Sequence, residues 1–280
     1  MIGAIIGDIV GSIYKYDNLK NKNFEFFKKE STFTDGTVMT VAIADFILSD
    51  SIPSQARLVG YFHAWFEKYP NKSYGNSFKK WMESFNNVYY TDFIPYNSYG
   101  NGAAMRISPI GDFSKVIEQA MKRVEFVTSV SHNHPEGVTG AQAIAALIVM
   151  ARTEKDKTKL REFVETKFKY NLNNSVDFLR VNYKYNETCQ DTVPEAIICF
   201  LESVDFEDAI RNAISIGGDS STLANITGSI AEAYYHEIPE WIIKETLSKL
   251  PLDIINVINN FYREVSYEYH EIAGKIKELR

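Results

Sequence analysis

The chain has 280 residues, of which 45% are apolar and 24% charged, and its 30 basic and 36 acidic side chains give a net charge of −6. These proportions are typical of a soluble globular protein and exclude a disordered or collagen-like chain. The mild negative charge argues against a strong nucleic-acid footprint, because non-specific binding to phosphates relies on basic side chains.

The apolar pattern and the cysteines indicate the compartment. The longest uninterrupted apolar run, Ala143–Ala151, is too short to cross a bilayer, which needs about 20 residues. The first residues lack the basic segment of a secretory signal and include Asp8. Cys189 and Cys199 have no metal-ligand spacing, and two cysteines exclude a disulfide framework. We therefore expect a cytoplasmic protein with no membrane segment.

Helical periodicity dominates the chain. The expected helices, in chain order, cover residues 37–48, 114–130, 141–151 and 155–169, one beginning at 205, and 222–235. The third is apolar almost all round, which is typical of a helix buried in a large core. The fourth is charged and is expected to have one solvated face. Asp205 is expected to cap its helix, and the last helix is rich in small residues that allow close packing.

Strand signals are scarce, since Asn101-Gly102 has no alternating apolar residues beside it. The stretch Asn71–Tyr99, rich in Asn, Tyr and Ser, is predicted to be a long surface excursion. No repeat, low-complexity tract or linker interrupts the chain. The sequence therefore predicts a single all-α domain over residues 1–280.

Five short segments contain more Gly, Asp, Thr, Asn and His than a helical core requires. They are residues 7–12, 33–37, 98–106, 131–137 and 217–222. Three of them immediately precede a predicted helix, where free backbone N–H groups and the helix dipole favour an anion. Glycines there let a ligand approach the backbone. Asp and Thr oxygens are hard ligands, suited to magnesium or calcium rather than zinc.

Each segment also has a purely structural interpretation. Thr34 and Asp35 are equally expected as helix caps, and Gly217-Gly218-Asp219 is a common turn. The segments become functional evidence only if the fold brings them together.

The histidines and the arginine of these segments are ambiguous in the same way. His132 and His134 resemble a metal pair, but no third nitrogen or sulfur ligand lies nearby, so a zinc site is disfavoured. His63, within an apolar stretch, is interpreted as a packed core histidine. Arg106 is open to a structural pairing with an acid.

Taken together and in order, these segments resemble the ADP-ribosylglycohydrolase (ADP-ribosyl-acceptor hydrolase) family, from Gly3 to about Trp241. The motifs that carry the resemblance are Gly7-Asp8 with Gly11-Ser12, Thr34-Asp35, the run from Tyr99 to Arg106, the run from Ser131 to Gly137, Cys189 to Glu195, and Gly217-Gly218-Asp219 before the run ending at Tyr235.

The resemblance implies an all-α fold with a cleft that holds two Mg²⁺ or Mn²⁺ ions and cleaves an ADP-ribosyl group from its acceptor. Two hard cations would hold the ribose hydroxyls and activate a water, with a carboxylate accepting its proton. The family positions retained for metal binding are Thr34, Asp35, Asp219 and Thr222. Those implied to contact the nucleotide are Ser98, Tyr99, Gly100, Asn101, Gly102 and His132.

The sequence departs from the family at three carboxylates. Lys15 replaces the glutamate expected after the first segment, Gly36 replaces the second aspartate of the Thr-Asp-Asp run, and Ser221 replaces the second aspartate of the Asp-x-Asp-Thr run. Glycine offers no side-chain ligand and serine is a poor substitute for a bridging carboxylate.

The main hypothesis is a family member that recognises ADP-ribose or an ADP-ribosylated partner and has lost the two-metal site. One alternative is an active N- or O-glycoside hydrolase using one metal or none, so the cofactor is Mg²⁺, Mn²⁺ or absent. The other is a structural or interaction protein with a vestigial cleft.

The three replacements also suggest an electrostatic hypothesis. Two lost aspartates remove two negative charges, and glutamate to lysine changes the charge by two more, which together equal the charge of two divalent cations. Lys15 is therefore expected to point into the vacated metal position and to bridge Asp35, Asp219 or both at the former catalytic centre. The alternative is that Lys15 extends into solvent.

Overall fold

The computed structural model describes residues 1–15, 17–49, 53–85, 90–265 and 274–276, and within these ranges all regular structure is helical. This confirms the all-α prediction. The elements in chain order are α1 (Ile2–Gly11), α2 (Asp35–Ser49), α3 (Gln55–Lys68), α4 (Asn76–Glu83), the short 3₁₀ helix η1 (Tyr90–Asp92), α5 (Gly102–Met105), α6 (Ser108–Phe113), α7 (Ile117–Thr128), α8 (Pro135–Ala151), α9 (Lys157–Phe168), α10 (Val176–Asn182), α11 (Val193–Leu201), α12 (Phe206–Ser215), α13 (Ser220–Tyr235), α14 (Glu240–Ser248) and α15 (Leu252–Glu264).

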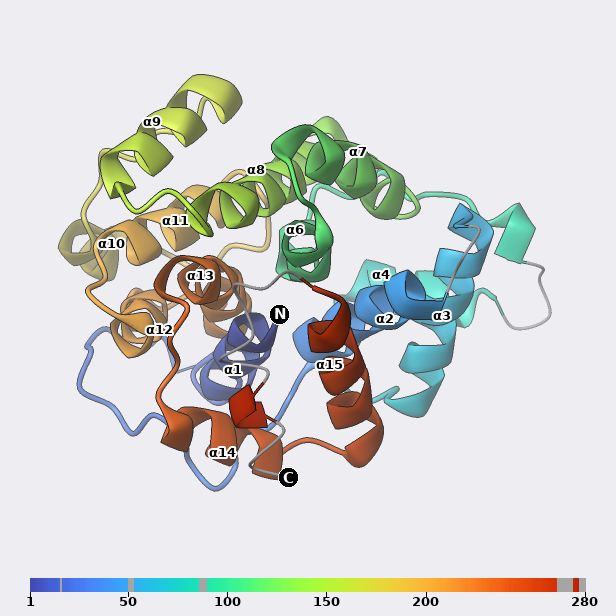
Figure 1. The fold of residues 1–280 in the computed structure, drawn as a ribbon, viewed down its shortest axis with the longest axis horizontal. Helices are drawn as coiled ribbons and strands as arrows, with labels where there is room; N and C mark the ends of the chain where they lie inside the picture. The colour runs from blue at the N-terminus through green and yellow to red at the C-terminus, as the bar shows by residue number, and fades with distance from the viewer. Residues whose placement is uncertain (16, 50–52, 86–89, 266–273, 277–280) are drawn as a thin grey trace.

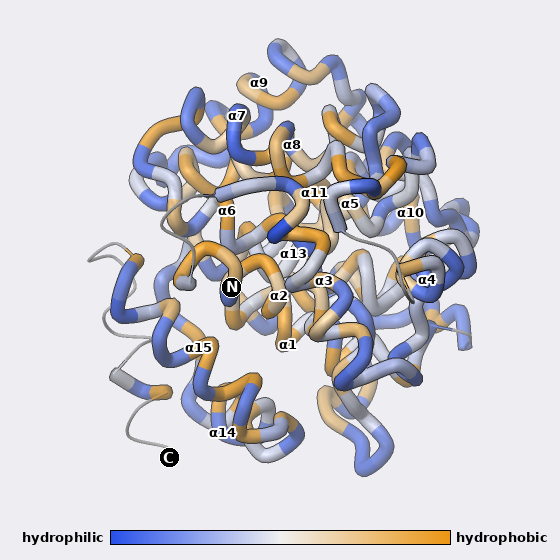
Figure 2. Tube along the Cα trace, turned by 90° about the vertical axis from the view of Figure 1, so that its right-hand side faces the viewer, coloured by the Kyte–Doolittle hydropathy of each residue, from blue (hydrophilic) through white to orange (hydrophobic). Residues whose placement is uncertain are grey.

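The core is built around α1, α13, α2 and α8, while the remaining helices cover them (Figure 1). Every residue of α1 is buried, and α8 buries most of its length. Figure 2 shows the apolar residues concentrated along α1, α2 and α13, with polar stretches on the outer helices such as α4 and α9. A helix that is apolar on all sides is stable only when other helices surround it, which explains the central place of α1.

The contact between α1 and α13 is made by glycines at every fourth residue of α1. A Cβ atom added at Gly3 would lie 2.2 Å from the carbonyl oxygen of Gly228, and one added at Gly7 would lie 2.0 Å from that of Ala224. At Gly11 the added atom would lie 2.6 Å from the carbonyl oxygen of Ser220. Residues four apart share one face of a helix, so the two backbones touch along this face. The end of α1 therefore lies against the start of α13.

The predicted helices agree with the structure to within three residues at their ends, except that α8 begins six residues before the predicted 141. The 37–48 pattern lies within α2, 114–130 contains α7, 141–151 lies within α8, and 155–169 contains α9. Asp205 caps α12 by accepting a hydrogen bond from the backbone N–H of Asp208 at 2.7 Å.

The predicted surface excursion over 71–99 is wrong for much of its length. Helix α4 lies within it and buries Phe78, Trp81 and Met82, and η1 follows. The Asn- and Ser-rich composition hid an apolar face, because large residues three and four positions apart pack together on one side of a helix. Residues 86–89 lie outside the described part of the chain.

Two sequence expectations about the rest of the chain are tested by the fold. No helix of the described ranges is long and apolar enough to cross a membrane. Cys189 and Cys199 are both buried and form no disulfide.

Candidate active site

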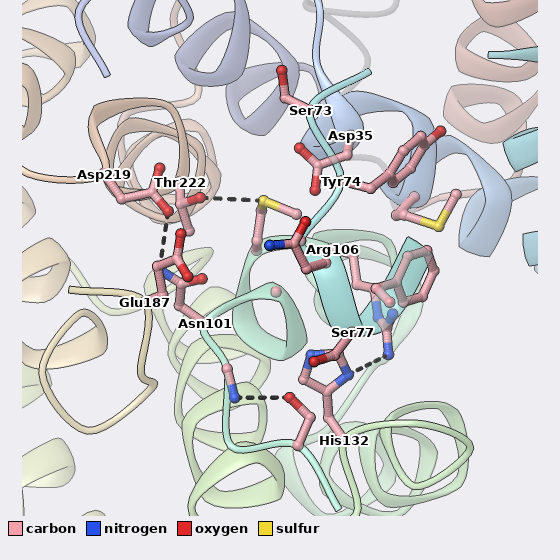
Figure 3. Close-up of a pocket in the computed structure, with 18 of the residues that line it drawn as sticks. Asp35, Ser73, Tyr74, Ser77, Asn101, Arg106, His132, Glu187, Asp219 and Thr222 are labelled. Carbon is pink, nitrogen blue, oxygen red and sulfur yellow. Dashed lines mark hydrogen bonds between the residues drawn. The ribbon is translucent and has the colours of Figure 1, made fainter. Parts of the chain in front are cut away.

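Segments distant in the sequence meet around a cavity of about 400 Å³. Of the residues singled out from the sequence, the cavity is lined by Lys15, Asp35, Ser98, Gly100, Asn101, Gly102, His132, Asp219 and Thr222. Figure 3 shows Asp35 and Asp219 reaching the cavity from two different helices, with His132 at another side. Two expected residues lie elsewhere: the Tyr99 side chain is half exposed and packs on His134, and Thr34 lies behind the cavity on Asp8.

The starts of α2 and α13 place the two aspartates. Asp35 is the first residue of α2, and Asp219 precedes α13 without using its carboxylate as a cap. Gly217 and Gly218 turn the chain into α13 at φ values of 73° and 72°, in the left-handed region that favours glycine. A Cβ atom at Gly218 would also lie 2.5 Å from the Tyr183 ring. This turn brings the Asp219 carboxylate to the cavity wall.

Lys15 forms an ion pair with Asp219, with 3.0 Å between Nζ and Oδ1. The pair is largely buried, since the side chains of Lys15 and Asp219 are 14% and 3% exposed. The other carboxylate oxygen, Oδ2, accepts a hydrogen bond from the Asn101 amide at 3.3 Å. Burial disfavours the ammonium form, but Asp219 outweighs it and raises the pKa of Lys15. The expected contact of Lys15 with Asp219 is therefore confirmed, and the alternative that Lys15 extends into solvent is wrong.

Asp8 is a second buried carboxylate behind this pair. It accepts hydrogen bonds from the backbone N–H groups of Thr34 (2.8 Å) and Thr37 (3.0 Å) and from both threonine hydroxyls. Burial raises the pKa of Asp8. Burial and the nearby Asp8 charge raise the pKa of Asp35 well above its ordinary value, and Lys15 opposes this only in part. Three aspartates thus lie around the Lys15 ammonium, and Asp35 is the one favoured to carry a proton.

The residues that replace the family's carboxylates do not fit two divalent cations. An added Cβ at Gly36 would lie 3.0 Å from Asp8 Oδ1 and 3.1 Å from Asn225 Nδ2. The Ser221 hydroxyl donates to Asp219 Oδ1 at 3.4 Å. Within the described ranges, no group of three or more His, Cys, Asp or Glu side chains is arranged to hold a metal ion. The Lys15 ammonium instead occupies the contact with Asp219 that a divalent cation would need.

Several lining residues were not found by sequence reasoning. Tyr74 and Ser77 come from the mispredicted 71–99 stretch, and Tyr185 and Glu187 come from the segment before α11. The Tyr185 hydroxyl donates to Glu187 at 2.5 Å, and the Glu187 backbone carbonyl accepts from the Asn101 N–H at 2.7 Å. These residues carry no local motif, so only the fold identifies them.

Asn225 was also missed, and it lies beside Asp8 and Gly36. Its side chain is fully buried, and neither amide atom has a hydrogen-bond partner among the described residues. The available signal was its spacing, since a residue three positions after Thr222 lies on the same face of α13.

The ambiguous histidines and Arg106 have separate roles. His134 caps α8, with its Nδ1 accepting from the Glu136 N–H at 3.2 Å, and unlike His132 it does not line the cavity. His63 is only partly buried, and its Nδ1 lies 3.0 Å from the Tyr90 hydroxyl. Arg106 has no carboxylate partner within the described residues, so a structural pairing with an acid is not found.

Comparisons with known proteins agree with the fold and the motifs. The ADP-ribosylglycohydrolase family model matches residues 1–270. The ADP-ribosylhydrolase ARH3 of Mus musculus is 23% identical over 86% of this chain and 84% of its own length. The ADP-ribosylarginine hydrolase Tri1 of Pseudomonas putida (strain GB-1) is 24% identical over 89% of this chain and 74% of its own length. A solved structure described as an ADP-ribosylglycohydrolase-related protein complex has a TM-score of 0.67 at 17% identity, covering 99% of this chain and 94% of that one.

Proposed function

Because the chain belongs to the ADP-ribosylglycohydrolase family, we propose that its cavity recognises ADP-ribose, free or attached to a partner, without two-metal hydrolysis. The ion pair between Lys15 and Asp219 carries the proposal. A carboxylate that by family resemblance would bind a divalent cation is instead neutralised by an ammonium of the chain itself. The Lys15 side chain thus provides the positive charge that would otherwise come from a bound metal ion.

The ligand-binding half of the cavity supports recognition. The loop residues Ser98, Gly100, Asn101 and Gly102 and the ring of His132 line the same space as the ion pair. A volume of about 400 Å³ lies within the range of small-molecule and cofactor sites. Hydroxyl groups of a ribose at the Lys15 end would find both donors and acceptors, and the diphosphate would face the glycine loop.

Thermal unfolding with ADP-ribose, in EDTA and in Mg²⁺, tests the proposal. A ligand at 100 times its dissociation constant stabilises a protein by about 2.7 kcal/mol. For 280 residues this corresponds to a rise in Tm of about 4–5 °C, from an unfolding entropy of about 2.1 cal/mol/K per residue. We expect this rise in EDTA, and no larger one in Mg²⁺.

The other outcomes identify the alternatives. A rise that requires Mg²⁺, together with release of ADP-ribose from an ADP-ribosylated peptide, would overturn the proposal in favour of an active hydrolase. No rise under either condition would overturn it in favour of a vestigial cleft. Release of ADP-ribose in EDTA would show hydrolysis that uses no metal, and this too would contradict a purely recognising role.

A further inference from the structure

Arg106 is a buried cation without a matching anion. It follows α5, is 2% exposed, and its guanidinium carbon lies 4.7 Å from the ring centre of Phe62 and 5.7 Å from that of Phe78. No carboxylate of the described residues pairs with it, and its Nε has no hydrogen-bond partner there. Burial lowers the pKa of Arg106 to about 10, so it remains charged at neutral pH. An unpaired buried charge is costly and needs a compensating function or partner.

The guanidinium donates toward one edge of the His132 ring. Arg106 Nη2 lies 2.7 Å from the Ser131 hydroxyl and 3.3 Å from His132 Nδ1, and the hydroxyl lies 2.9 Å from the same Nδ1. A guanidinium has donors only, so Nδ1 must carry a lone pair to accept from it. With its oxygen accepting from Arg106, the Ser131 hydroxyl is also placed to donate to Nδ1.

The opposite edge of the ring faces the glycine loop. Cβ atoms added at Gly100 and Gly102 would lie 3.6 Å and 3.5 Å from His132 Nε2, and all three residues line the cavity. Nε2 has no hydrogen-bond partner in the described part of the chain. The arrangement of Arg106 beside the His132 ring is visible in Figure 3. The Tyr96 ring packs against His132 with a centroid distance of 5.8 Å.

We propose that Arg106 is a positioning residue that keeps His132 neutral with its proton on Nε2, so that this N–H is directed at the diphosphate that the family resemblance places at the glycine loop. This inference rests on the proposed recognition of ADP-ribose. Burial and the Arg106 charge both lower the pKa of His132, so the ring does not compete for a second proton. The negative charge of the bound diphosphate then lies on the far side of the His132 ring from the buried Arg106 guanidinium and compensates its charge.

Nitrogen-detected NMR of the ligand-free protein tests the positioning role. The chain has five histidines, and the signals of His132 are assigned by their loss in His132→Gln. We expect a neutral ring with the proton on Nε2 from pH 5 to pH 8. Arg106→Met should raise the share of the tautomer with its proton on Nδ1, whereas Ser131→Ala, which keeps the cation at Nδ1, should leave the proton on Nε2. A ring that titrates near its ordinary pKa in the unaltered protein, or carries its proton on Nδ1, would overturn the inference.

Calorimetric titration with ADP-ribose tests the contact itself. His132→Gln places an amide N–H near the position of Nε2–H and should keep the affinity within a few-fold. His132→Leu has no donor and should weaken binding by roughly 10- to 100-fold, as expected for a hydrogen bond to a charged group. His134→Gln is the matched control, because His134 lies on the same segment but does not line the cavity, and it should bind normally.

The two experiments separate this inference from the proposed function. If the unaltered protein does not bind ADP-ribose, the proposed function fails, and the NMR result still decides the role of Arg106. If the unaltered protein binds and His132→Leu binds equally well, the inference fails while the proposed function stands.

Discussion

Replacing Lys15 by methionine should destabilise the protein, because the apolar stem is kept while the ammonium is lost. Asp219, 3% exposed, would remain as a buried carboxylate without its cation. Removing one partner of a buried pair costs about 3–5 kcal/mol, and the 14% exposure of Lys15 favours the lower end. With an unfolding entropy near 0.6 kcal/mol/K for 280 residues, a loss of about 3 kcal/mol lowers Tm by about 5 °C.

Chemical and thermal unfolding measure this effect against a control in the same chain. Lys22 pairs with Asp208 at 2.5 Å, but its side chain is 37% exposed. Lys22→Met should therefore cost no more than about 1 kcal/mol. The double variant Lys15→Met with Asp219→Asn should recover most of the lost stability, because both buried charges are then absent. Equal stabilities of Lys15→Met and Lys22→Met, or a double variant no better than the single one, would refute the buried-pair interpretation.

Three further predictions follow from the site and its surroundings. Gly100→Trp should abolish ADP-ribose binding in calorimetry while leaving the unfolding curve nearly unchanged, since the new side chain fills the cavity beside Ser98; unchanged binding heats would place the ligand elsewhere. Lys15→Glu, Gly36→Asp and Ser221→Asp together should create a divalent-metal site that none of them creates alone, and tight Mg²⁺ binding by the unaltered protein would contradict this. Burial raises the pKa of Glu195 from 4.5 to about 7, so the folded state holds this proton more tightly and Glu195 lowers stability as pH rises through that window. Glu195→Gln should then gain up to about 3 kcal/mol in urea unfolding at pH 8 and little at pH 4, and an equal gain at both pH values would disprove the assignment.

Local patterns predicted the helices and part of the site. The helices α2 and α8 were found because their burial makes most of their residues apolar, which can be read in the chain. The Lys15 contact was predicted from the family resemblance, which places Lys15 at a lost glutamate beside Asp35 and Asp219, together with the charge of the lysine.

The remainder of the site depends on distant segments meeting. Glu187 and Tyr74 line the cavity only because the 183–191 segment and the start of α4 fold over it. For Arg106 the sequence leaves a pairing with an acid open, and nothing in its neighbourhood in the sequence indicates that its partners are Ser131 and the ring of His132.

The backbone contact between α1 and α13 has a consequence for how this site can change. Its two walls, one carrying Lys15 and the other Asp219, are spaced by main-chain atoms at Gly3, Gly7 and Gly11. In many small metalloproteins the ion itself organises the ligands, and its loss unfolds them. Here the distance between the walls is set independently of any bound species. Side chains at this junction can therefore change while the spacing between the two helices is kept.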